Sequence, residues 1–215
     1  MRTIRTKVYK FNELSENAKD NAIERWRNSD NEMFWSNENR DSMKAFADML
    51  PITVKDWSYG GRGEGVYFTF DERDEIEELT GQRLATYLWN NYKNEIYSKK
   101  YLGDLNVKHC VYHNRIKTKD YKNGNFGNAY YSAISIEKYN CPFTGYCMDN
   151  EILAPMYEFM DKPNNRTNFK ELIEECFDAW IKACNNDIDY QNSDEYIIEQ
   201  IEANEYEFTQ DGKMI

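Results

Sequence analysis

An unbroken helical stripe of apolar residues near the C-terminal end is the feature that most constrains this chain. The stripe follows i, i+3, i+4 and i+7 spacing and consists of Phe169, Leu172, Ile173, Cys176, Phe177, Trp180, Ile181 and Cys184. A period of 3.6 residues predicts an α-helix that buries one face in a core. Thr167 stands just before the stripe, where a hydroxyl can accept a hydrogen bond from the first turn, so we expect it to be the N-cap.

Weaker patterns of the same period predict further helices. One should follow Ser15, its expected N-cap, because apolar residues recur there every four positions. Two more are expected at about residues 31–50 and 79–97, and Ser193 should begin a shorter one. With five cysteines and 40% hydrophobic residues in 215, the chain can build a core and is too apolar to be disordered.

Strand patterns are interleaved with these helices. Alternation predicts a strand at residues 4–11, and aromatic and β-branched runs predict hairpins near residues 52–70 and 107–139. A closing hairpin is expected around an Asp211-Gly212 turn. The fold class is therefore expected to be α+β with a mostly antiparallel sheet, several helices and a helical C-terminal third. We expect an α+β domain at 1–162 and a helical region at 163–215, packed together as one unit.

Glycines at residues 60–65 allow two interpretations. They resemble a phosphate-binding loop, but the Lys-Ser/Thr pair of such loops is missing and a strand pattern follows where a helix is required. A hairpin turn with positive φ angles explains them better.

Acidic residues outnumber basic ones, and the formal net charge is -11. The excess is concentrated in the last third and in residues 71–78, whereas residues 81–140 are net basic. The acids of the short block are Asp71, Glu72, Asp74, Glu75, Glu77 and Glu78. One interpretation is a solvated loop whose negative charges are stabilised by the N-terminal dipole of the next helix. The other is a phosphate mimic that binds a basic partner protein.

The basic middle of the chain favours direct nucleic-acid binding as an alternative. Its cations alternate with tyrosines, as in single-strand binders, and are Lys99, Lys100, Arg115, Lys117, Lys119 and Lys122. The whole-chain charge opposes this interpretation, because a negative molecule is repelled by nucleic acid at long range.

Zinc-type ligands occur as His109, Cys110, His113, Cys141 and Cys147. On a strand the two histidines would lie about 13 Å apart and Cys110 would face the other side, so the spacing disfavours a metal site. We expect no cofactor and no metal, with His109 and His113 as the weak alternative. The odd, sparse cysteines indicate reduced thiols, and no apolar run has the length of a membrane span, so we expect a cytoplasmic protein.

Two segments carry a family resemblance. Residues 8–27 resemble the opening of many small phage and prophage proteins, a strand followed by Phe-x-Glu-Leu-Ser-x-x-Ala-Lys-x-x-Ala-Ile. Residues 57–68 echo the glycine-rich turn of some members, and residues 203–212 are similar to their closing Ala-Asn-Glu-Tyr-Glu-Phe-Thr-x-Asp-Gly. These motifs are structural, so they assign no catalytic residue.

The resemblance implies a mobile-element accessory protein, a group that includes inhibitors of host defence such as anti-CRISPR proteins. We therefore expect a phage-encoded acidic binding protein that occludes the nucleic-acid groove of an RNA-guided nuclease, with no membrane contact. The alternatives are an anti-defence enzyme, either a nuclease or a modifier, and a nucleic-acid-binding accessory protein. The enzyme hypothesis is less favoured because the sequence has no Gly-x-Ser-x-Gly nucleophile elbow and only two histidines that could act as a general base.

Overall fold

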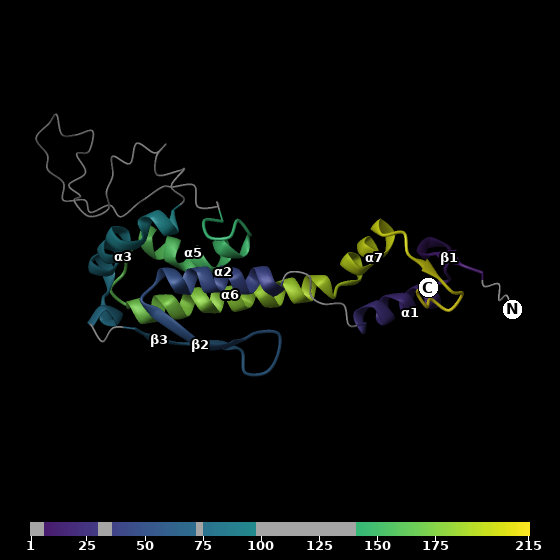
Figure 1. The fold of residues 1–215 in the computed structure, drawn as a ribbon, viewed down its shortest axis with the longest axis horizontal. Coiled ribbons are helices and arrows are strands. Elements are labelled where there is room, and N and C mark those ends of the chain that lie inside the picture. The colour runs from purple at the N-terminus through teal and green to yellow at the C-terminus, as the bar shows by residue number, and fades with distance from the viewer. Residues whose placement is uncertain (1–6, 30–35, 72–74, 98–140) are drawn as a thin grey trace, which may run out of the picture. The chain divides into compact units, whose positions relative to one another are not determined.

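The computed structural model describes residues 7–29, 36–71, 75–97 and 141–215 (Figure 1). These ranges contain six α-helices and two antiparallel sheets of two strands each, which confirms the expected α+β class. The chain divides into two compact units, here called the terminal unit (Met1–Ser36 with Asn185–Ile215) and the central unit (Asn37–Cys184). The boundary expected between residues 162 and 163 lies inside the central unit.

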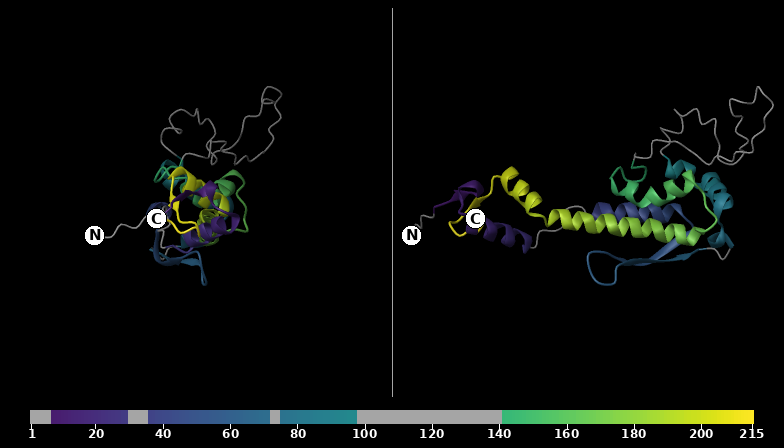
Figure 2. Two further views of the ribbon diagram at one scale, coloured as in Figure 1. Left: turned by 90° about the vertical axis from the view of Figure 1, so that its right-hand side faces the viewer. Right: turned by 180° about the vertical axis from the view of Figure 1, so that it is seen from behind.

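Four helices and a hairpin form the central unit. In chain order its elements are α2 (Ser36–Met49), β2 (Ile52–Ser58), β3 (Gly65–Phe70), the 3-10 helix η2 (Glu75–Glu78), α3 (Gly81–Ile96), α5 (Met148–Asp161) and α6 (Phe169–Gln191). Helix α6 belongs to this unit as far as Cys184, and its last residues belong to the terminal unit. Within the unit α2 and α6 lie side by side, with α3 and α5 on one side of them and the hairpin on the other (Figures 1 and 2). The helices predicted near residues 31–50 and 79–97 are α2 and α3.

The predicted apolar stripe is the buried face of α6. All eight of its residues are buried, and Trp180 is completely enclosed. The N-cap is Asn168 rather than Thr167. The Glu171 N–H donates to Asn168 Oδ1 across 2.8 Å, and the Asn168 N–H donates to Glu171 Oε2 across 2.9 Å. This reciprocal capping box satisfies two backbone donors, which one hydroxyl at Thr167 would not.

The hairpin predicted at residues 52–70 is confirmed. Strands β2 and β3 pair antiparallel from Ile52 with Phe70 to Ser58 with Gly65, and the register shifts between Val54 and Asp56. In the connecting turn Gly60 and Gly63 have φ near +79°. The element that follows this turn is the strand β3, whereas a phosphate-binding loop is followed by the N-terminus of a helix.

Helix α5 was not predicted from the sequence. It contains Pro155, which usually ends a helix because it donates no backbone hydrogen bond. Five apolar side chains of α5 on either side of Pro155 are nearly or fully buried: Ile152, Leu153, Met156, Phe159 and Met160. Their burial outweighs one missing backbone hydrogen bond, so tertiary packing overrides local propensity here.

The terminal unit has its own core. Its elements are β1 (Tyr9–Lys10), the 3-10 helix η1 (Phe11–Glu13), α1 (Glu16–Arg27), α7 (Asp194–Ala203) and β4 (Glu207–Phe208). Helices α1 and α7 begin after Ser15 and Ser193 as predicted, and the Tyr196 N–H donates to Ser193 Oγ across 3.3 Å. Strand β1 pairs antiparallel with β4. Of the strand expected at 4–11, residues 7, 8 and 11 lie outside β1, and residues 4–6 are outside the described ranges. The core consists of Phe11, Leu14, Ala18, Ala22, Ile23, Ile197, Ile201 and Phe208.

The first and last segments of the family resemblance pack against each other in this unit. The closing turn at Asp211 and Gly212 forms as predicted, with the Gly212 N–H donating to Thr209 O across 3.0 Å. A Cβ on Gly212 would lie 2.0 Å from the carbonyl oxygen of Ala18 in α1. Residues 8–27 and 203–212 are therefore two halves of one structural element.

Some expectations concern residues outside the described ranges, among them the hairpin at 107–139. In the described part of the chain, none of the helices combines the length and apolarity needed to cross a bilayer.

Candidate functional site

A group of carboxylates lies on the exposed side of α6, opposite its buried stripe. Glu171, Glu175 and Asp178 follow one another at four- and three-residue spacing, which places them on one face of the helix, and all three are exposed. Glu158 of α5 lies close enough to act on Glu175 electrostatically. We call these four residues the acidic face.

The electrostatics of the acidic face are visible at its central residue. The pKa of Glu175 is raised above its usual value, first because the carboxyl is partly desolvated. The carboxylates of Glu171, Asp178 and Glu158 then raise it further by repulsion. Within the described ranges no lysine or arginine pairs with any of these four acids, and the ion pair on α6 joins Lys170 to the neighbouring Glu174 at 3.9 Å. The acidic face therefore holds four carboxylates, none of which is in an ion pair with a described cation.

The acidic block predicted as the partner-binding site is only partly described. Asp71 lies at the end of β3, where its carboxylate accepts a hydrogen bond from the Thr53 hydroxyl. Glu77 and Glu78 lie in η2, outside the first turn of α3, so the dipole of that helix does not explain them. Glu72, Asp74 and the side chain of Glu75 are outside the described part, and the role of this block stays a prediction.

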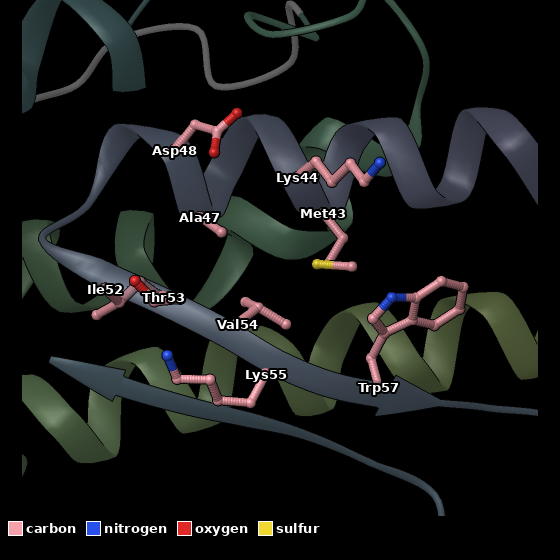
Figure 3. A pocket seen from close by; sticks show the side chains of 9 residues that line it. All are labelled: Met43, Lys44, Ala47, Asp48, Ile52, Thr53, Val54, Lys55 and Trp57. Atoms are coloured by element: carbon pink, nitrogen blue, oxygen red, sulfur yellow. The ribbon is translucent and has the colours of Figure 1, made fainter. Parts of the chain in front are cut away.

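A groove lies between α2 and the edge strand β2 (Figure 3). Its volume is about 500 Å³. Helix α2 contributes Met43, Lys44, Ala47 and Asp48, and β2 contributes Ile52, Thr53, Val54, Lys55 and Trp57. Sequence reasoning missed this groove because its walls come from two elements whose packing no local pattern indicates.

The two described cysteines of the zinc-type cluster flank a tightly bonded loop before α5. The buried Asp149 carboxylate accepts from the Phe143, Thr144 and Gly145 N–H groups at 2.9, 2.7 and 3.2 Å, and from the Thr144 hydroxyl at 2.9 Å. Both oxygens of this carboxylate are thus engaged by the loop, which they hold against the start of α5.

Cys141 belongs to the same loop and is not activated. Desolvation raises the pKa of its thiol, and Asp149 and Cys147 add to the shift, while the Asn150 side-chain amide that donates to Sγ across 3.2 Å opposes it. The protonated thiol is a poor nucleophile and metal ligand. Cys147 is exposed, and the four cysteines of the described ranges are all free thiols.

The alternative sites cannot be assembled from the described residues. In those ranges no three histidine, cysteine, aspartate or glutamate side chains are grouped to hold a metal ion. His109, Cys110 and His113 lie outside them, as do the six cations considered for nucleic acid, Lys99, Lys100, Arg115, Lys117, Lys119 and Lys122.

Comparisons with protein-family models, curated proteins and solved structures give no match. The acidic face and the groove therefore have to be interpreted from their own geometry and charge.

Proposed function

We propose that this protein is a binding protein whose acidic face docks on a basic surface of a partner. The observation that carries the proposal is the gathering of Glu158, Glu171, Glu175 and Asp178 from two helices, none of them in an ion pair with a described lysine or arginine. Like charges held together raise the free energy of the unbound protein, and a partner's arginines or lysines would relieve that repulsion.

The partner class that suits this surface is a protein with a groove for nucleic acid. Such grooves are lined with arginine and lysine that neutralise phosphates, and a rigid row of carboxylates presents the same charge. Helix α6 is a rigid support for such a row because its opposite face is fully buried. From the resemblance to phage proteins we further propose a host defence protein as the target, with an RNA-guided nuclease as the first candidate.

Capture by an immobilised RNA-guided nuclease, free of guide RNA, tests the proposal. The test variant carries Glu171→Gln, Glu175→Gln and Asp178→Asn, and keeps the capping box because glutamine can also accept from the Asn168 N–H. The matched control carries Glu195→Gln, Glu199→Gln and Glu202→Gln, three exposed acids of α7. The two variants change the net charge equally.

We expect the test variant to lose about tenfold in affinity, since three exposed charges each contribute up to about 1 kcal/mol, and the control to lose less than about twofold. Raising the salt from about 0.05 to about 0.5 M should weaken wild-type binding strongly. Equal losses in both variants would rule out the acidic face as the docking surface. No capture at low salt would rule out this nuclease class as the partner.

A further inference from the structure

The groove between α2 and β2 contains an open strand edge. Strand β2 pairs with β3 on one side, and among the described strands it has no neighbour on the other. In Figure 3 that second edge faces α2 across the groove. An unpaired edge presents backbone donors and acceptors to any chain that can lie beside it.

The register of the hairpin identifies the groups that point toward the groove. The Asp71 N–H donates to Pro51 O across 3.0 Å. Proline has no N–H to return a second bond, so this single bond marks Pro51 with Asp71 as a hydrogen-bonded position of the ladder. Bonded and non-bonded pairs alternate in an antiparallel ladder, so Thr53 with Thr69 is the next bonded pair and Val54 with Phe68 is not. The N–H and C=O of Val54 therefore point away from β3, and within the described ranges neither bonds to the backbone of a loop, turn or cap.

The lining of the groove is mixed, and its apolar part is already ordered. Met43, Ala47 and Ile52 are buried members of the main core, so their positions are fixed by packing behind the groove. Trp57 is held edge-on against the enclosed Trp180, with 5.8 Å between ring centroids and an interplanar angle of 79°. A preformed apolar wall of this kind costs little reorganisation when a side chain binds to it.

The charge around the groove differs from that of the rest of the molecule. Its ionisable lining residues are Lys44, Lys55 and Asp48, which leaves a net positive charge in a chain of net charge -11. Both lysines are exposed, and within the described ranges neither forms an ion pair. An occupant with carboxylates is thus favoured over a neutral or basic one.

We propose that this groove binds an extended acidic peptide segment of a partner protein as an added strand beside β2. The segment pairs with the backbone groups of Val54, places apolar side chains against the half-buried Val54 and Trp57, and directs its carboxylates toward Lys44 and Lys55. The four residues Ile52–Lys55 line the groove, so about four peptide residues can pair there. This surface is separate from the acidic face, and each proposal can fail without the other.

The first test is amide hydrogen exchange at Val54, in the full chain. We expect fast exchange in the free protein and at least tenfold slower exchange when an octapeptide of alternating valine and glutamate is added. Slow exchange in the free protein at low concentration would overturn the proposal, because the edge would then be covered by another part of this chain. Slow exchange that appears only at high protein concentration would also overturn it and assign the edge to a second copy.

The second test separates backbone pairing from charge. A double variant with Lys44→Glu and Lys55→Glu should bind the glutamate peptide at least tenfold more weakly and prefer a peptide with lysine in place of glutamate. The matched control carries Lys182→Glu and Lys213→Glu, two exposed lysines that do not line the groove, and should bind like the wild type. Methylating the central peptide nitrogens should abolish binding to every form. Strand addition would be refuted if the methylated peptide bound as tightly as the unmethylated one, or if both double variants lost the same affinity for the glutamate peptide.

Discussion

The indole N–H of Trp180 donates a hydrogen bond to the backbone carbonyl oxygen of Asn39 across 2.9 Å. Both residues are buried, and the bond joins α6 to α2, elements separated by 141 positions in the sequence. Trp57 and Tyr59 of the hairpin pack edge-on against the same indole ring. One side chain thus holds three elements of the central unit together, and it packs against Trp57, which lines the groove.

Replacing Trp180 with phenylalanine should therefore destabilise the central unit. The change removes one buried hydrogen bond and leaves a cavity, which together should lower the free energy of unfolding by about 2 kcal/mol. Urea denaturation followed by far-ultraviolet circular dichroism measures this loss. The control is Tyr190→Phe at an exposed ring, where we expect a change within about 0.5 kcal/mol. Similar losses in the two variants would contradict the role assigned to Trp180.

Gly212 offers a test of how the two ends of the chain fit together. In Gly212→Ala the new Cβ would be 2.0 Å from Ala18 O, and the residue has φ +78°. The matched control is Gly63→Ala, which has φ +79° but nothing within 4 Å of its Cβ. Both changes carry the cost of a left-handed backbone, about 1 kcal/mol or more. The collision should add at least about 2 kcal/mol at Gly212 alone.

Hydrogen exchange of the α1 and α7 amides is the readout for Gly212→Ala, because it reports on the terminal unit alone. We expect faster exchange in both helices for this variant and no change in them for Gly63→Ala. Unchanged exchange in the Gly212 variant would mean that the closing turn does not pack on α1.

The pH dependence of stability should reveal the repulsion within the acidic face. The pKa of Glu175 is raised in the folded protein above its usual 4.5, so folding favours the protonated carboxyl. The ionised form is then destabilising at neutral pH, and this penalty disappears as the pH falls through the raised pKa. Glu175→Gln should stabilise the protein at pH above that value and lose its advantage below it. Denaturant titrations across this pH window check the sign, with the exposed Glu199→Gln as the control. A constant difference at all pH values would contradict the assignment.

The elements that the sequence predicted are those encoded by local periodicity. The stripe at 169–184 and the β-branched arms of the first hairpin each bury a face that their own spacing defines. The N-cap was misplaced by one residue because Asn168 acts together with Glu171, a pair that a search for one hydroxyl overlooks. Helix α5 was missed because Pro155 argues locally against a helix, and only its buried neighbours reverse that.

The candidate sites were harder to predict because they also depend on packing between elements that are distant in the sequence. The row Glu171, Glu175, Asp178 can be found from helical spacing, but Glu158 joins it only through the packing of α5 beside α6. The groove depends on how closely α2 approaches β2 and on which backbone groups of Val54 face outward. Which backbone groups of β2 face outward follows from the pairing register of the hairpin, and the composition of a strand does not determine that register.

The most direct test of the docking surface is the dissociation constant of one charge reversal at its centre. We would measure Glu175→Lys against Glu199→Lys on α7, each binding the same immobilised, guide-free RNA-guided nuclease. Both variants change the charge by the same amount, and both positions are exposed. We expect Glu175→Lys to bind at least tenfold more weakly than Glu199→Lys, because a cation would then face the partner's arginines at the centre of the contact. Equal dissociation constants for the two variants would contradict binding through the acidic face.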